Sequence, residues 1–150
     1  MVCLGNICRS PLAEGILKSK VNPDHVEVDS AGTAGYHIGE PPDERSISIA
    51  QEYGIDISGQ RCRTFQANDF QLFDCIYAMD EANLAHILAK AQSGDDRKKV
   101  KLLLEEVSLG IREVPDPYYG GKKGFEEVFH LINLACEAIC QNLEHQNNRS

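Results

Sequence analysis

The N-terminal stretch of the chain places a cysteine and an arginine at a spacing that suits phosphate chemistry. Cys3 and Arg9 are separated by five residues, and Ser10 and Pro11 follow directly. A thiolate is a strong nucleophile, and backbone N–H groups in a loop that leads into a helix can stabilise a thiolate and bind phosphate. The guanidinium of Arg9 offers a fork of donors to phosphoryl oxygens. The pattern therefore predicts an anion cradle with Cys3 as the nucleophile at its floor.

The residues around this pair favour the cradle over the simpler alternative, a buried cysteine that happens to lie near a surface arginine. Gly5 and Asn6 both tolerate the positive φ that a tight anion-binding loop needs. Ser10 is a good N-cap, and Pro11 suits the first position of a helix. None of the other cysteines has an arginine six positions later.

A second stretch, around Asp116, could supply an acid. Phosphoryl transfer to a thiolate needs a proton for the departing oxygen, and a carboxylic acid on a loop can donate it. Pro115 and Pro117 stiffen the backbone on either side of Asp116. Tyr118 and Tyr119 could form walls for an aromatic leaving group. Taken alone, the stretch also fits a plain Pro/Gly turn with exposed tyrosines.

The elements that must position these groups follow from the apolar periodicity of the chain. Short apolar runs predict strands at 25–30, 73–79 and 100–104, and helical spacing predicts helices at 11–20, 43–53, 81–91 and 125–143. Strands that alternate with helices predict an α/β fold, a parallel sheet covered on both faces. Ligands of such sheets bind beyond the carboxyl ends of the strands. The cradle, after the first strand, and segment 107–123, after the last, are therefore expected to meet at one site.

The first strand is short for its place in this scheme. Only Met1 and Val2 precede Cys3, whereas a strand usually has about five residues. We expect a truncated first strand, or one completed by a partner, and an N-terminally extended chain should then be more stable.

Composition and length narrow the class of protein. The chain has 150 residues, of which 42% are hydrophobic and 25% charged, as expected for a single domain spanning residues 1–150. A net charge of −8 argues against nucleic acid or an anionic membrane as the main partner. The sequence shows neither a membrane-spanning run nor a signal peptide, which predicts a cytoplasmic protein with reduced cysteines. We expect Cys62, Cys75, Cys136 and Cys140 to be core residues or inert.

These motifs together resemble those of the low-molecular-weight protein tyrosine phosphatases. The resemblance rests on the run Cys3-Leu-Gly-Asn-Ile-Cys-Arg-Ser-Pro11 and on Asp116-Pro-Tyr118, and it extends to Ser30-Ala-Gly-Thr33 and Ala78-Met-Asp-Glu81. It covers nearly the whole chain. It implies a four-stranded parallel sheet flanked by helices on both faces, the flavodoxin-like phosphatase fold.

The resemblance also implies catalytic roles for three residues. Cys3 would attack phosphorus and form a cysteinyl-phosphate, and Arg9 would clamp the phosphoryl oxygens. Asp116 would protonate the leaving phenolate and then activate water. The resemblance assigns the rest of the site to a phosphate-binding loop of Leu4, Gly5, Asn6, Ile7, Cys8 and Ser10, with Ser30 in its supporting hydrogen-bond network.

Further residues would shape and regulate the pocket. Tyr36 stands where the family often has Trp on one wall, and Tyr118 and Tyr119 form the opposite wall and resemble the family's phosphorylation sites. Cys8 would trap oxidised Cys3 as a reversible disulfide. Gln60 stands where some members have His. The implied substrates are phosphotyrosine proteins or small aryl phosphates, with no metal or cofactor, and the protein is expected to be a monomer or weak dimer.

Three alternatives stay open at this point. A protein arginine phosphatase of the same fold carries Thr where Ile7 stands, and the bulky Ile7 favours an aryl ester over a guanidinium. An arsenate reductase of the same fold needs a redox cysteine after Met79, and none occurs between Asp80 and Arg112. A phosphate-binding module without activity would have no need to retain Cys3 together with an acid.

Overall fold

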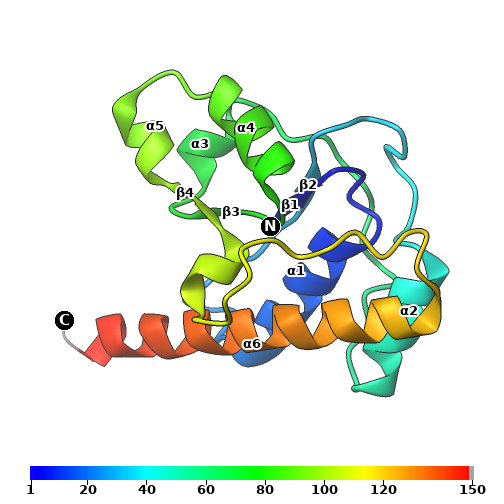
Figure 1. Ribbon diagram of the computed structural model, residues 1–150. Helices are drawn as coiled ribbons and strands as arrows, with labels where there is room; N and C mark the ends of the chain where they lie inside the picture. The colour runs from blue at the N-terminus through cyan, green and yellow to red at the C-terminus, as the bar shows by residue number, and fades with distance from the viewer. Residues whose placement is uncertain (149–150) are drawn as a thin grey trace.

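Four short parallel strands form one sheet with helices on both of its faces (Figure 1). The structure, a computed structural model, describes residues 1–148. The strand order is β2-β1-β3-β4, with β1 Val2–Cys3, β2 Ala31–Gly32, β3 Ile76–Ala78 and β4 Val100–Leu102. Val2 pairs with both Ala31 and Ala78, so β1 lies inside the sheet. The predicted α/β class and four-stranded parallel sheet are confirmed, and β1 has two residues.

The helices divide into two groups, one on each side of the sheet (Figure 1). On one side α1 (Arg9–Lys20), α2 (Glu44–Glu52) and the long α6 (Gly121–Asn148) pack against one another, with the 3₁₀ helix η1 (Leu103–Glu106) against α6. On the other side lie α3 (Asp69–Leu72), α4 (Glu81–Ala89) and α5 (Gly94–Lys98), of which α4 packs on β3 and β4. The Asp43 side chain caps α2, and Gly54, at φ 76°, follows its C-terminus.

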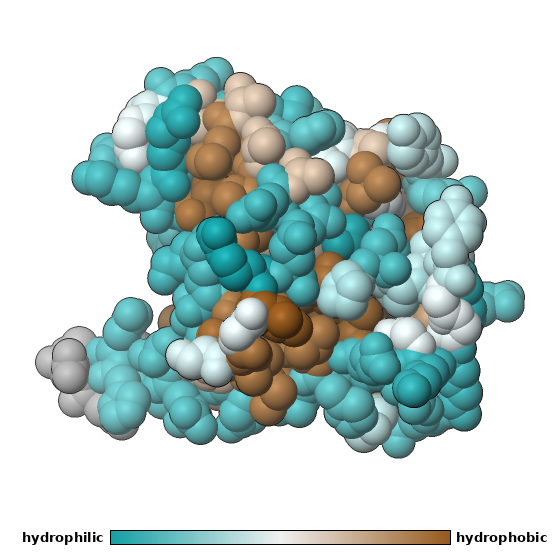
Figure 2. Space-filling model, viewed as in Figure 1, coloured by the Kyte–Doolittle hydropathy of each residue, from teal (hydrophilic) through white to brown (hydrophobic). Residues whose placement is uncertain are grey.

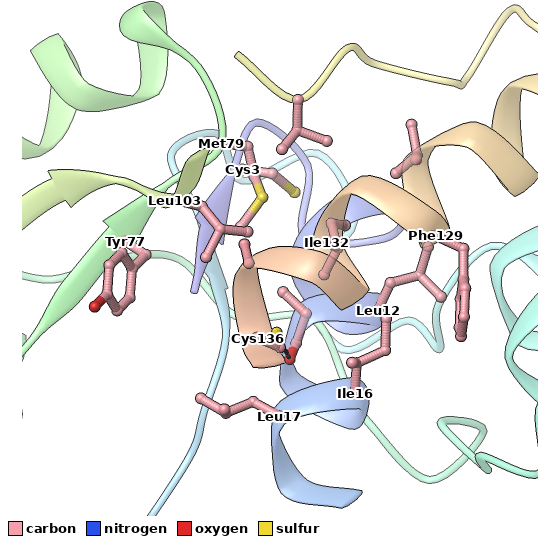
Figure 3. Close-up of a cluster of buried hydrophobic side chains, with 14 of the residues drawn as sticks. Cys3, Leu12, Ile16, Leu17, Tyr77, Met79, Leu103, Phe129, Ile132 and Cys136 are labelled. Carbon is pink, nitrogen blue, oxygen red and sulfur yellow. Dashed lines mark hydrogen bonds between the residues drawn. The ribbon is translucent and has the colours of Figure 1, made fainter. Parts of the chain in front are cut away.

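Successive strand residues point to opposite faces and so feed two separate cores. Val2, Ile76, Ala78 and Leu102 pack with Phe70 and Ile87 under α3 and α4. Cys3, Tyr77, Met79 and Leu103 face the other core, where Leu12, Ile16, Phe129 and Ile132 fill the space between α1 and α6 (Figure 3). Each fully buried Leu, Ile or Phe contributes about 1.5–3 kcal/mol. The floor of the cradle therefore rests directly on the larger core.

The helices predicted from periodicity are all present, with boundaries that differ by up to five residues. The predicted strand at 25–30 is wrong, because the strand forms at Ala31–Gly32 instead. Strand pairing requires a neighbour, and β1 runs beside Ala31 and Gly32 only. The alternation before them serves packing, since Val28 is buried in the larger core. Of the four cysteines expected to be core residues or inert, Cys75 is not a core residue, because its side chain is exposed.

The surface is mostly polar in the view of Figure 2, with apolar area over the segment after η1. Leu109 and Ile111 are exposed in that segment. In the part of the chain that the structure describes, no helix is both long and apolar enough to cross a membrane.

Candidate active site

The loop that joins β1 to α1 wraps around the sulfur of Cys3. Cys3 ends β1, and α1 begins at Arg9. Between them Asn6 adopts a left-handed conformation, with φ 57°, and its backbone N–H donates to Cys3 Sγ at 3.3 Å. Of the two residues predicted to allow positive φ, only Asn6 uses it. Asn is one of the few residues other than Gly that adopt this conformation readily.

A chain of buried hydrogen bonds runs from the sulfur to a carboxylate. Ser10 Oγ lies 3.0 Å from Cys3 Sγ and accepts a hydrogen bond from Asn6 Nδ2 at 2.8 Å. The same Asn6 Nδ2 donates to Ser30 Oγ, whose hydroxyl donates to Glu14 Oε1 at 2.7 Å. Besides Cys3 Sγ, the Ser10 hydroxyl has the Ala31 carbonyl oxygen within reach, at 3.4 Å. The sulfur of Cys3 therefore has two polar neighbours, the Asn6 backbone N–H and the Ser10 hydroxyl.

Ser10 is therefore not the N-cap that the sequence predicted. Helix α1 starts two residues earlier than predicted, with Cys8 at the N-cap position and no capping side chain. The Ser10 hydroxyl contacts Cys3 Sγ instead. Glu14, at the far end of the chain of hydrogen bonds, is 5% exposed and pairs with Lys18 at 2.7 Å. Sequence reasoning missed Glu14, because an acidic residue inside a helix gives no signal of its own.

The outer side of Asn6 is held by the segment around residue 62. Cys62 Sγ donates to the Asn6 carbonyl oxygen at 2.8 Å, and the Arg63 backbone N–H donates to Asn6 Oδ1 at 3.0 Å. Cys62 is buried, as predicted, and burial raises the pKa of its thiol to about 11. It therefore stays protonated and can donate. Gln60, from the same segment, contacts α1, where its Nε2 donates to the Pro11 carbonyl oxygen.

Arg9 links the cradle to the opposite side of the site. Its side chain is 3% exposed, and its Nη1 donates to Asp80 Oδ2 at 2.7 Å and to the Val114 carbonyl at 3.0 Å. Its Nη2 lies 3.7 Å from Asp116 Oδ2. The sequence predicted that the cradle and the Asp116 segment meet at one edge of the sheet, and the structure brings them together. Asp80, which caps α4, was missed as a partner of Arg9.

Most of the predicted site residues line a pocket of about 280 Å³. It is lined by parts of the cradle and of two other loops, namely Cys3, Leu4, Gly5, Ile7, Cys8, Arg9, Tyr36, His37, Asp116, Tyr118 and Tyr119. Asn6, Ser10 and Ser30 do not line it, since they lie buried beneath the loop. His37 was not predicted to line the pocket, because no motif marks this histidine. A larger cleft, of about 620 Å³, opens elsewhere, beside Val26, Val28 and Ile76, away from the cradle.

The three tyrosines differ in exposure. Tyr118 is 40% exposed, whereas Tyr36 and Tyr119 are 76% and 96% exposed. The rings of Tyr118 and Tyr119 meet edge to face, with centroids 5.0 Å apart. Of the two predicted opposite walls, the one formed by Tyr118 is therefore more buried than the one formed by Tyr36.

Cys8 is a second thiol that lines the pocket. Burial raises the pKa of the Cys8 thiol to about 12, and the nearby negative charges of Asp43, Cys3 and Asp116 act in the same direction. Cys8 is therefore protonated at neutral pH. The pocket brings together the Cys3 sulfur, the Arg9 guanidinium and the Asp116 carboxyl group, a set of groups that suits chemistry at a phosphoryl group.

Comparison with known proteins agrees with this geometry. The family model described as "Low molecular weight phosphotyrosine protein phosphatase" matches residues 1–149. A relative from Bacillus subtilis, the low molecular weight protein-tyrosine-phosphatase YfkJ, is 39% identical, and the alignment covers 97% of this chain and 94% of that protein. The crystal structure of YfkJ has a TM-score of 0.88 and covers 97% of this chain and 92% of its own.

Two further solved structures hold ligands of informative chemistry. A protein tyrosine phosphatase from Entamoeba histolytica, with Hepes in its active site, is 36% identical with a TM-score of 0.89, covering 97% of this chain and 96% of that chain. Wzb from Vibrio vulnificus, in complex with benzylphosphonate, is 29% identical with a TM-score of 0.83, covering 94% of each chain.

Proposed function

The chain belongs to the low molecular weight phosphotyrosine protein phosphatase family, and from this premise we propose that it hydrolyses phosphotyrosine in proteins and small aryl phosphates through a cysteinyl-phosphate. One observation carries the proposal. Cys3 lines a pocket of about 280 Å³ that Arg9 and Asp116 also line, and its sulfur accepts a hydrogen bond from the Asn6 N–H and lies 3.0 Å from the Ser10 hydroxyl.

In the first step, the Cys3 thiolate attacks phosphorus, and the bond from phosphorus to the aryl oxygen breaks. The Asp116 carboxyl gives its proton to that oxygen, so that a neutral phenol leaves. Arg9 and the backbone N–H groups of the cradle bind the three remaining phosphoryl oxygens, on which negative charge is spread in the transition state. The ion pair with Asp80 holds the guanidinium of Arg9 in place before substrate arrives.

In the second step, Asp116 acts as a base. Its carboxylate removes a proton from a water molecule, the water oxygen attacks phosphorus, and the sulfur–phosphorus bond breaks. The products are inorganic phosphate, the Cys3 thiolate and a protonated Asp116, ready for the next turnover. The Ser10 hydroxyl, 3.0 Å from the sulfur, stabilises the thiolate as it leaves.

The walls of the pocket favour an aromatic ester. Ile7 and Tyr118 present apolar and aromatic surface to the pocket, and a flat ring between them would bury about the area of a Tyr side chain. The related Wzb was solved with benzylphosphonate, a phosphonate that carries an aromatic ring. These two observations support an aryl phosphate as the substrate. No observation favours phosphoarginine or arsenate instead.

Regulation by oxidation follows from the second thiol. A peroxide would oxidise Cys3 to a sulfenic acid, and the Cys8 thiol would displace water from it to form a disulfide. Reduction by a dithiol would restore both thiols.

Tyr119, 96% exposed at the pocket rim, is more accessible for phosphorylation than Tyr118. We expect the protein to act in the cytoplasm as a monomer or weak dimer.

The proposal is tested by comparing three substrates. The chain should hydrolyse p-nitrophenyl phosphate and a phosphotyrosine peptide but not a phosphoarginine peptide. The Cys3→Ser variant should lose turnover while still binding phosphate. Hydrolysis of phosphoarginine in preference to phosphotyrosine would overturn the substrate assignment, and an active Cys3→Ser variant would overturn the mechanism.

A further inference from the structure

Arg45, near the start of α2, connects two parts of the site although it does not line the pocket. Its Nε and Nη2 make a two-pronged contact with the carboxylate of Asp43, at 3.0 and 2.9 Å. Its Nη1 donates to the Tyr118 carbonyl oxygen at 2.8 Å. An ordinary surface ion pair would end at Asp43 and would contribute little to stability. Arg45 also bonds to the backbone of Tyr118, in a loop far from α2 in sequence, and a simple surface ion pair does not account for this contact.

The guanidinium of Arg45 also lies over two aromatic rings. Its central carbon is 5.3 Å from the centroid of Tyr118 and 4.6 Å from that of Phe125. Both distances fall within the range of cation–π attraction. The planar fork of arginine can stack on a ring and bind a carboxylate in its plane at once, and a lysine cannot. The Asp43 pair holds the plane in this orientation, because the hydrogen bonds from Arg45 lower the pKa of Asp43 and keep it ionised.

The contacts of Arg45 extend to both catalytic loops. On one side, the Asp43 backbone N–H donates to the Ile7 carbonyl of the phosphate-binding loop at 2.8 Å. On the other side, Tyr118 lies two residues after the acid, and its backbone N–H donates to Asp116 Oδ1 at 3.1 Å. Figure 1 shows the segment before α6 descending beside α2, where this bridge is made.

We propose that Arg45 is a positioning residue that fixes the acid loop relative to the phosphate-binding loop and thereby aims Asp116 at the leaving oxygen. This rests on the proposed function, and it assigns to Arg45 a contribution to one proton transfer. Asp116 is 47% exposed at its side chain, and its near neighbour Arg9 approaches only to 3.7 Å. The loop therefore needs a second support, and the Arg45 bridge supplies it from the solvent side.

The test uses the dependence of the rate on the leaving group. An acid matters little when the departing phenolate is stable, as with p-nitrophenyl phosphate, and matters greatly with phenyl phosphate. General acid catalysis contributes about 10²–10⁴-fold, so a misaimed acid should cost phenyl phosphate about tenfold more in kcat/KM than p-nitrophenyl phosphate. We expect this for Arg45→Met, and a smaller effect for Arg45→Lys, which keeps the charge without the fork.

Two controls make the test specific. Arg97→Met removes an exposed arginine from α5, on the other side of the sheet, and should leave the ratio of the two rates unchanged. In an Asp116→Asn background, Arg45→Met should no longer change the ratio, because no acid is left to aim.

The outcomes separate the inference from the function on which it rests. An equal loss for both substrates, or no loss, in a folded Arg45→Met protein would refute the positioning role. If Arg45→Met does not fold, the ratio measured for Arg45→Lys decides in the same way. A wild-type chain inactive on both substrates would instead contradict the proposed phosphatase activity.

Discussion

Replacing Asn6 by alanine should lower the free energy of unfolding far more than an ordinary substitution of a polar residue does. The Asn6 side chain makes three hydrogen bonds, to Ser10 Oγ, to Ser30 Oγ and from the Arg63 N–H. At about 1 kcal/mol each, they contribute about 3 kcal/mol. Alanine at a φ of 57° adds about 1 kcal/mol, because a Cβ is strained there. The expected loss in the free energy of unfolding is therefore about 4 kcal/mol by this sum.

The measurement is urea unfolding of the wild type, Asn6→Ala, Asn6→Gly and Asn68→Ala. Asn6→Gly loses the same hydrogen bonds without the strain and should be about 1 kcal/mol more stable than Asn6→Ala. Asn68 is exposed and makes no capping bond at the start of α3, so its replacement should change stability by no more than about 0.5 kcal/mol. An Asn6→Ala protein as stable as Asn68→Ala would refute the assignment of these bonds.

The same variants report on the cradle. Phosphate at 100 times its dissociation constant should stabilise the wild type by about 2.7 kcal/mol. Asn6 shapes the loop that binds the anion, so Asn6→Ala should lose most of this stabilisation. Full phosphate stabilisation in Asn6→Ala would show that the loop keeps its shape without that side chain.

Three further predictions address redox behaviour, pH and the pocket wall. After peroxide treatment, a dithiol should restore the activity of the wild type but not of Cys8→Ser, as an assay before and after reduction will show; equal recovery would contradict the proposed disulfide with Cys3. The pKa of Asp43 is lowered in the folded protein, chiefly by its hydrogen bond with Arg45, so Asp43 stabilises the fold above its ordinary pKa of 3.8 and loses this effect as pH falls through the lower, folded value. Asp43→Asn should therefore be less stable than the wild type at pH 7, with a difference that shrinks below about pH 3.8 in unfolding measurements, and a constant difference would argue against the ion pair. Tyr118→Ala should raise KM for a phosphotyrosine peptide about tenfold by loss of about 1.4 kcal/mol of ring contact, while the exposed Tyr119 should be replaceable at little cost, and equal effects would refute the distinction.

Much of the fold could be predicted because periodicity is a local signal. The helix over Asp43–Tyr53, for example, carries its cap, its apolar stripe and its stop at Gly54 within a dozen residues. The strand at 25–30 was wrong because pairing depends on a neighbour distant in sequence. The alternation of Val26 and Val28 is the same whether a partner lies beside them or not.

The site residues also divide into those that local sequence marks and those that only folding brings together. Cys3, Arg9 and Asp116 could be singled out because their chemistry is marked by spacing and by flanking prolines. Glu14 and Cys62 could not, since the contacts of Glu14 with Ser30 and of Cys62 with the Asn6 carbonyl exist only after folding. Asp80 is intermediate, because Ala78-Met-Asp-Glu81 resembles a family motif, although only the structure shows its contact with Arg9.

The central claim is that phosphate passes through the sulfur of Cys3. The most direct test is to quench the reaction of p-nitrophenyl phosphate with acid during the first turnover and to map the modified peptide by mass spectrometry. We predict a phosphoryl group on the peptide that contains Cys3, and no modification in Cys3→Ser. Turnover without phosphate on Cys3, or with phosphate on another residue, would contradict the mechanism.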